Sequence, residues 1–220
     1  MTGMPPLLRR YLSHPPWLYL AASAFALVVQ LNPGWREWLV YDRPALAQGQ
    51  WWRAWTGHWV HFGWPHFVPD TGLFLIVGWL LEEKHKLFAR LAVFLMPAVI
   101  SAVIYWGEPD MVRYGGLSAI DLGLLLYLAA QGWQRNWSDW FWPAVLAIYI
   151  VEIVLEARHG GQGGGAIRFD EPSIRIATGA HLAGTAYALV SWLAAFLTRK
   201  WRQGPVAVGQ DRDECDRLGG

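Results

Sequence analysis

The stretch Arg113–Trp133, RYGGLSAIDLGLLLYLAAQGW, decides the fold class. Two glycines open it, and the apolar run that follows is hydrophobic on nearly all sides rather than along one stripe. A helix of that kind lies inside a large core or crosses a membrane. Ser118 and Asp121 stand near the start of the run, although polar groups inside a bilayer are expensive and usually face a partner or a water-filled cavity. The stretch therefore predicts a membrane helix that carries a polar site near one end.

The composition of the whole chain agrees with a membrane protein. Of its 220 residues, 54% are hydrophobic, and only 16% are charged, compared with roughly 25% in soluble domains. With a net charge of +1, the chain has no overall basic field that would suggest nucleic-acid binding. Basic residues precede the first apolar stretch, but no small-residue cleavage pattern follows it, which predicts a retained helix rather than a signal peptide.

Apolar segments recur along the chain. Trp and Tyr residues cluster at their ends, as expected at membrane interfaces. We therefore expect an all-α fold, a polytopic membrane protein with a single six-helix membrane domain over residues 1–204 and a polar, unstructured tail over residues 205–220. The six predicted spans are residues 17–31, 66–81, 87–106, 116–133, 140–157 and 178–197.

The distribution of Lys and Arg predicts the orientation in the membrane. If the six spans are real, one side carries a modest excess of basic residues in its short connections and termini, which places both termini in the cytoplasm. The basic residues of that side are Arg9, Arg10, Lys84, Lys86, Arg90, Arg135, Arg199, Lys200 and Arg202.

Two longer loops lie on the other side. Asn32–Pro65 is rich in Trp and His, and we expect it to be partly structured or to lie in the membrane interface. Ala157–Ala177 contains the glycine-rich stretch HGGQGGGAIRFDEPS, which suits either a movable cover over a site or a passive connector.

Polar residues occur at one depth on three of the predicted spans. The second, fourth and sixth spans run in the same direction, so that their starts lie at the same membrane face. His66 and Asp70, Ser118 and Asp121, and His181 each lie within about two turns of those starts. A serine and a histidine at matched depth suit a nucleophile and its general base. They also suit hydrogen bonds within or between helices, so catalysis and helix packing both remain open.

Two further groups of polar residues leave their roles open. Glu152 and Glu156 lie one turn apart on the fifth span, where they form either a polar face or a contact for a polar segment of a substrate. A metal-dependent hydrolase is a minor alternative, although the spacings match no compact zinc motif. Its ligands would come from His58, His61, His66 and Asp70.

Four short motifs resemble those of the rhomboid intramembrane serine proteases. GLSA at Gly116–Ala119 resembles the family's Gly-x-Ser-Gly motif, and AHLAG at Ala180–Gly184 resembles its Ala-His-x-x-Gly motif on the sixth helix. WWR at Trp51–Arg53 resembles the Trp-Arg pair of the first outer loop. HFGWPHFVPD at His61–Asp70 resembles the pattern of a His, a second His five residues later and an Asn four residues beyond. The motifs follow the family's order, and the resemblance covers about residues 15–200 and implies a six-transmembrane-helix rhomboid-like bundle.

The resemblance implies a serine endopeptidase without a cofactor. Ser118 would attack the scissile carbonyl, and His181 would take its proton. The oxyanion pocket would use the Ser118 backbone N–H and the His66 side chain, with a third donor at the position of Asp70. Gly116 and Leu117 belong to the same oxyanion and substrate-binding motif, and the residues with supporting roles would be His61, Arg53 and Asp121.

Within the family, the chain looks most like the rhombosortase branch. It is compact, has no extra cytosolic domain, and its first loop contains WRAWTGHWVHFGWPHF. The resemblance implies a bacterial inner-membrane enzyme whose site opens to the outer side. Its partners would be membrane-anchored substrates with a C-terminal Gly-Gly segment, one membrane helix and basic residues after it. The alternative is a weak or inactive rhomboid-like protein that binds membrane clients.

The chain departs from the family's pattern at three positions. The usual Asn is Asp70, which is either protonated and able to donate to an oxyanion, or ionised and paired with His66 or His61. Ala119 replaces the glycine after the serine and adds a methyl group where the fourth and sixth helices should meet closely. Leu122 occupies a position that is often aromatic or His in the family.

Overall fold

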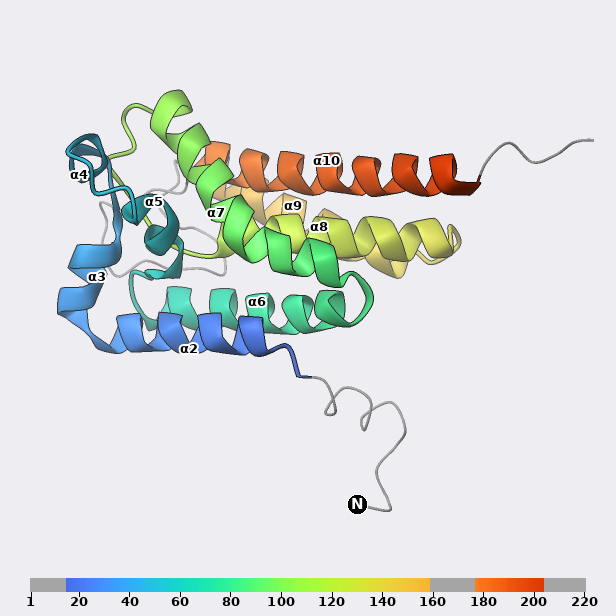
Figure 1. Cartoon of the computed structure of the whole chain (residues 1–220), viewed down its shortest axis with the longest axis horizontal. Coiled ribbons are helices and arrows are strands. Elements are labelled where there is room, and N and C mark those ends of the chain that lie inside the picture. Colours follow the sequence, from blue (N-terminus) through green and yellow to red (C-terminus); the bar gives the residue numbers. More distant parts are fainter. Residues whose placement is uncertain (1–14, 159–176, 204–220) are drawn as a thin grey trace, which may run out of the picture.

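A computed structural model describes residues 15–158 and 177–203 (Figure 1). The predicted all-α fold is confirmed, because the regular secondary structure of the described residues is helical apart from one pair of two-residue strands. Six long helices overlap the six predicted segments, although α8 begins two residues later than predicted and α10 ends at Gln203. These helices are α2 (Trp17–Leu31), α6 (Trp64–Lys84), α7 (Lys86–Gly107), α8 (Ser118–Arg135), α9 (Phe141–Arg158) and α10 (Thr178–Gln203).

Two of these helices are long and apolar enough to cross a membrane. They are α7 and Thr178–Arg202 of α10, and a third candidate arises only if α2 and α3 (Pro33–Leu39), which meet at 114°, count as one span. Polar side chains such as Asp70 in α6 and Asp121 in α8 lower the mean hydropathy of those helices. The count of six spans therefore remains a prediction.

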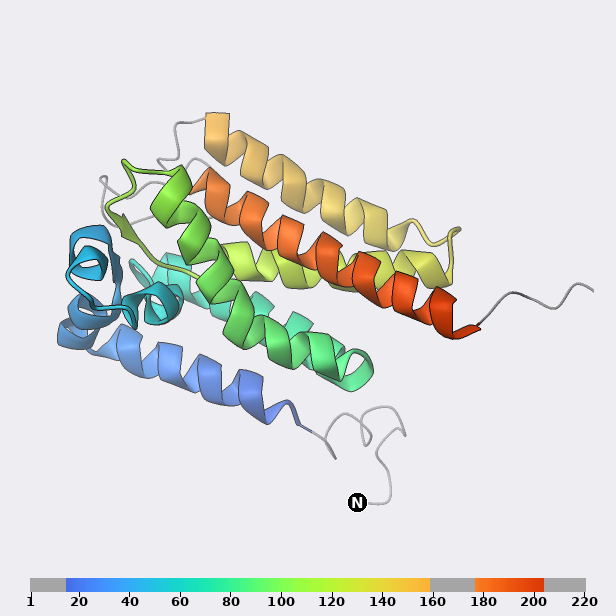
Figure 2. The same ribbon diagram turned by 45° about the horizontal axis from the view of Figure 1, so that its top comes forward.

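The helix α8 is the centre of the bundle. It contacts α6, α7, α9 and α10, and α10 also packs along α7 (Figures 1 and 2). Side chains on different faces of α8 are buried, including Ile120 with no exposed surface and Leu122, on the opposite face, with 6% exposed. The all-round apolar character of Arg113–Trp133 thus follows from contact with four helices rather than from lipid alone.

The loop between α2 and α6 is structured. It contains α3, β1 (Tyr41–Asp42), α4 (Arg43–Ala47), α5 (Arg53–Thr56) and the 3₁₀ helix η1 (Gly57–Trp59). Strand β1 pairs antiparallel with β2 (Arg113–Tyr114), so that Tyr41 lies opposite Tyr114. This pairing fixes the loop to the segment that leads into Ser118.

Two predicted features fall outside the described residues. They are almost the whole of the Ala157–Ala177 loop and the polar tail over residues 205–220. The side chains of Glu152 and Glu156 are likewise outside the description, although their backbone belongs to α9. The roles suggested for all of them remain predictions.

Candidate active site

The first turns of α6, α8 and α10 lie at the same end of the bundle (Figures 1 and 2). Ser118 is the first residue of α8, and His181 is the fourth residue of α10. The Ser118 Oγ lies 3.0 Å from Nε2 of His181, which is a hydrogen-bonding distance. His181 is buried and Ser118 is half-buried. The two side chains that the sequence places at matched depth are therefore in contact.

Two glycines allow this contact. A Cβ atom at Gly123 of α8 would lie 2.6 Å from the backbone carbonyl oxygen of Gly184 in α10, and a Cβ at Gly184 would collide with the carbonyl oxygen of Ala119. The two helices thus meet backbone to backbone, as small residues permit at helix interfaces in membranes. The extra methyl group of Ala119 is accommodated, because Gly184 faces its carbonyl group rather than its side chain.

Gly116 is required where the chain enters α8. Its φ of +118° is unfavourable for other residues, and a Cβ there would lie 2.6 Å from Nε2 of His66. The imidazole of His66 therefore lies directly against the backbone before Ser118. Its Nδ1 accepts a hydrogen bond of 3.3 Å from the Phe62 N–H, which leaves Nε2 to carry the proton of the neutral ring.

Asp70 accepts hydrogen bonds in this structure. Its Oδ2 receives the Leu117 N–H at 3.0 Å, and the same oxygen lies 3.1 Å from Nε2 of His66 and 3.6 Å from Nε2 of His61. Donors that converge on one oxygen stabilise an ionised carboxylate. The geometry therefore favours an ionised Asp70 that is paired with these groups over a protonated Asp70 that acts as a donor. The Leu117 N–H is bound to Asp70 in this arrangement.

His61 completes this cluster from the outer loop. It is fully buried, and its ring lies edge-on to that of His66 with centroids 5.0 Å apart. Burial lowers the pKa of His61, against the opposing effect of Asp70. A neutral imidazole in this position supports His66 by ring contact rather than by charge.

A second carboxylate caps the other helix of the pair. Oε1 of Glu108, at the end of α7, accepts a hydrogen bond of 2.5 Å from the Gly179 N–H in the first turn of α10. Asp70 and Glu108 thus provide acceptors for otherwise unpaired backbone N–H groups at the starts of both helices that carry the Ser–His pair. Sequence reasoning missed Glu108, because 71 residues separate it from Gly179 and no motif connects them.

Two of the predicted supporting residues, Arg53 and Asp121, lie in different environments. Arg53 is buried, and its NH1 donates to the carbonyl oxygens of Glu37 and Val40, so it holds the outer loop together. Asp121 is 1% exposed, and within the described part of the chain neither of its carboxylate oxygens has a hydrogen-bond partner.

The histidines do not assemble a metal centre in the described residues. Nε2 of His58 lies 3.0 Å from the carbonyl oxygen of Pro97 and 3.0 Å from Oγ of Ser101, and burial lowers the pKa of His58 to about 4. No group of three or more His, Cys, Asp or Glu side chains in residues 15–158 and 177–203 is arranged to hold a metal ion.

Comparison with known proteins agrees with this arrangement. The family model of the rhomboid domain matches residues 48–200, which include α6 to α9, all but the last three residues of α10, and both members of the Ser–His pair. No curated protein matches the chain. Because the matched region covers most of the sequence, the protein belongs to the rhomboid family, a family of membrane proteins that are in general intramembrane serine proteases and act on transmembrane substrates.

Proposed function

We propose that this protein is an intramembrane serine endopeptidase with Ser118 as nucleophile and His181 as general base. The observation that carries the proposal is the 3.0 Å contact between the Ser118 Oγ and Nε2 of His181, formed between residues 63 positions apart. A serine becomes an effective nucleophile only when an adjacent base accepts its proton. The contact places such a base, His181, beside Ser118 inside a buried helix interface.

Formation of the acyl-enzyme needs two proton transfers at one atom, and its hydrolysis by water repeats them, with the Ser118 oxygen as the leaving group. Nε2 of His181 takes the Ser118 proton during attack on the scissile carbonyl and returns it to the leaving amine. The other ring nitrogen, Nδ1, has no hydrogen-bond partner among the described residues, which supports a dyad rather than a triad. The contacts of α10 with α8 would then orient the ring.

The oxyanion would form at the start of α8. The Ser118 N–H belongs to the first turn of the helix, where backbone donors and the helix dipole favour negative charge. Nε2–H of His66 lies beside this turn, but in this structure it is 3.1 Å from Oδ2 of Asp70, so it would have to turn away from that carboxylate to donate to the oxyanion. We assign Asp70 a positioning role, since it holds His66 and the Leu117 N–H rather than donating to the oxyanion itself.

The basic residues support an active site that opens to the periplasm of a bacterial inner membrane. Lys84, Lys86 and Arg199 lie at the end of the bundle opposite Ser118. They belong to the excess of basic residues that predicts the cytoplasmic side. Arginines at the outer end have structural partners instead: NH2 of Arg113 lies 2.7 Å from Glu37, and Arg43 donates to carbonyl oxygens of α7 and its C-cap.

The substrate class in this proposal is that of the rhombosortase branch. The first-loop sequence WRAWTGHWVHFGWPHF supports it. The substrate would be a membrane-anchored protein with a C-terminal Gly-Gly segment, a single membrane helix and basic residues that follow it. Residues without a Cβ suit a site where His66 already lies against the backbone of Gly116.

Labelling with a fluorophosphonate tests the nucleophile without a substrate. Purified wild type in detergent should be labelled, whereas Ser118→Ala and His181→Ala should not be, and the control Ser138→Ala at an exposed turn should behave as wild type. Labelling that persists in Ser118→Ala rejects the proposed nucleophile. An unlabelled wild type that co-purifies with intact membrane clients would instead identify a client-binding protein.

Co-expression with an anchored client tests the substrate class. A reporter with the Gly-Gly segment should be released into the medium or periplasm, and release should stop in Ser118→Ala, in His181→Ala and in the double variant alike. Residues that act as one unit show non-additive losses. Equal release of a client with Val-Val in place of Gly-Gly would reject the Gly-Gly specificity while leaving the protease assignment intact.

A further inference from the structure

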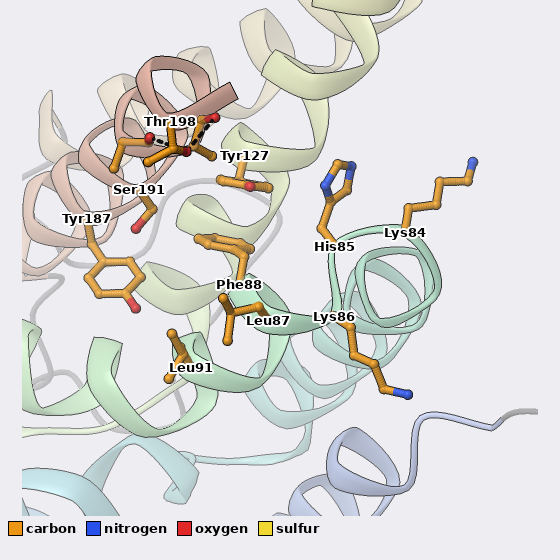
Figure 3. Close-up of a pocket in the computed structure, with 12 residues that line it drawn as sticks. Lys84, His85, Lys86, Leu87, Phe88, Leu91, Tyr127, Tyr187, Ser191 and Thr198 are labelled. Atoms are coloured by element: carbon orange, nitrogen blue, oxygen red, sulfur yellow. Dashed lines mark hydrogen bonds between the residues drawn. The ribbon is translucent and has the colours of Figure 1, made fainter. Parts of the chain in front are cut away.

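A groove of about 590 Å³ opens at the end of the bundle opposite Ser118 and His181, and Figure 3 shows the residues that line it. It lies between the connection from α6 to α7, the first turns of α7, and the C-terminal halves of α8 and α10. Its volume is within the range of about 300–1,000 Å³ that is typical of small-molecule sites. None of the residues placed in the proposed catalytic machinery lines it.

The floor and walls of the groove are apolar. The rings of Phe88 and Tyr127 stack with centroids 3.5 Å apart, and Leu87 and Leu91 extend from α7 along one side. Leu87 is 74% exposed, so this wall continues outward onto the surface of the bundle. Small side chains of α10 provide the space opposite it, namely Ser191, Ala194, Ala195 and Thr198.

The rim of the groove is cationic. Lys84 and Lys86 are exposed on either side of His85 in the connection between α6 and α7, and neither forms an ion pair with another described residue (Figure 3). Burial lowers the pKa of His85, and Arg199, Arg135 and Lys84 lower it further by charge repulsion. Positive charge from three parts of the chain therefore converges at one end of an apolar groove.

We propose that this groove binds one anionic phospholipid of the cytoplasmic leaflet. The side chains of Lys84 and Lys86, which extend outward from the rim in Figure 3, would turn toward the phosphate at the mouth of the groove, and one acyl chain would lie on Phe88 and the Leu87–Leu91 wall, against the small residues of α10. Basic pockets between helices at the cytoplasmic side suit anionic headgroups, and each basic residue near the surface contributes about 1 kcal/mol, which for two lysines is about thirtyfold in affinity.

Two other occupants fit the groove less well. The basic residues that follow the membrane helix of the proposed clients would be repelled by Lys84, Lys86, Arg135 and Arg199. A free phosphate would satisfy the lysines but leave the apolar floor exposed to water, whereas an acyl chain gains about fourfold in affinity for each buried CH₂ group.

Native mass spectrometry of the full-length protein in a neutral detergent tests the proposal. The probes are dioctanoyl phosphatidylglycerol, dioctanoyl phosphatidylcholine and inorganic phosphate. Wild type should retain one phosphatidylglycerol, with at least about tenfold preference over phosphatidylcholine. The Lys84→Gln/Lys86→Gln double variant should lose about thirtyfold in affinity for phosphatidylglycerol.

Two more variants separate this site from general surface charge. Lys200→Gln/Arg202→Gln removes two charges from the same end without touching the groove, and its affinity should fall less than about threefold. Ser191→Trp keeps every charge but fills the groove, and it should abolish retention. Circular dichroism and gel filtration establish that each variant is folded.

Several outcomes would overturn the proposal. They are equal affinity for the two lipids, an equal loss in the Lys200/Arg202 variant, and undiminished retention in Ser191→Trp. Displacement of phosphatidylglycerol by millimolar inorganic phosphate would assign a free-anion site and would also reject the lipid.

Discussion

The backbone N–H of Leu117 donates a 3.0 Å hydrogen bond to Oδ2 of Asp70, so that a carboxylate of α6 caps the helix that begins with Ser118. The same oxygen lies 3.1 Å from Nε2 of His66. One side chain thus fixes both the start of the proposed nucleophilic helix and the imidazole beside it.

Replacement of Asp70 should separate its two roles. Asp70→Ala leaves the Leu117 N–H and His66 without their acceptor, and each unsatisfied buried group costs about 1–3 kcal/mol. We expect a lower unfolding temperature and a loss of cleavage that approaches the 10²-fold typical of an oxyanion donor. Asp70→Asn keeps one acceptor but removes the charge, so it should be folded and slower than wild type. Cleavage measured against pH decides this, because an Asn variant that matches or exceeds wild type would favour the protonated-donor alternative.

Gly116→Ala should impair the site. The added Cβ conflicts with a φ of +118° and with Nε2 of His66 at 2.6 Å, so either the backbone or the imidazole must move. A strained backbone position costs on the order of 1–3 kcal/mol. The matched control is Gly72→Ala on α6, where nothing lies within 4 Å, and the helical alanine should stabilise the protein by about 1 kcal/mol. Thermal unfolding and fluorophosphonate labelling are measured for both variants. Equal labelling rates for Gly116→Ala and Gly72→Ala would contradict the expected impairment of the site.

Gly184→Ala should separate the Ser–His pair. Its Cβ would collide with the Ala119 carbonyl, and the resulting shift of α10 would lengthen the 3.0 Å contact between Ser118 and His181. We expect labelling of Ser118 to be lost, with destabilisation of about 1–3 kcal/mol from overpacking. Ala119→Gly is the control at the same interface, since it should retain labelling and lose only about 1 kcal/mol of helix propensity. Normal labelling of Gly184→Ala would show that the backbone contact is not required.

Glu108 should act as a positioning residue for His181. Glu108→Ala removes the acceptor of the Gly179 N–H two residues before the histidine, a loss of about 0.5–2 kcal/mol for a helix cap. The turnover rate should fall while the KM for an anchored client changes little, and Glu108→Gln should restore most of the rate. Asp110→Ala, at an exposed neighbouring position, serves as the control. A change in KM alone would assign Glu108 to substrate binding instead.

His58 should make the stability of the protein depend on pH. Its pKa is about 4 in the folded protein and 6.5 in the unfolded chain, so the folded state resists protonation. The corresponding stabilisation is complete above pH 6.5 and is lost as the pH falls toward 4, which amounts to about 2 kcal/mol between pH 8 and pH 5. His58→Gln keeps a donor for the Pro97 carbonyl and should flatten this part of the curve. Unfolding temperatures of both proteins across this range provide the measurement, and parallel curves would reject the assignment.

The sequence by itself determined the fold class and the candidate pair. Hydropathy and periodicity are local properties, so the apolar runs predicted the long helices to within a few residues. The common direction of alternate helices predicted that Ser118 and His181 lie at one depth. The position of Lys and Arg at helix ends predicted the cytoplasmic side.

Only the tertiary structure decided how those residues meet. The rotation of α8 against α10 depends on the backbone contact at Gly123 and Gly184, which hydropathy does not encode. The direction of the Asp70 hydrogen bonds and the cap from Glu108 join residues 47 and 71 positions apart, and their chemistry follows from which atoms face each other. Local pattern fixes which segments become helices, whereas the closest approach of their side chains and backbones fixes what those helices can do.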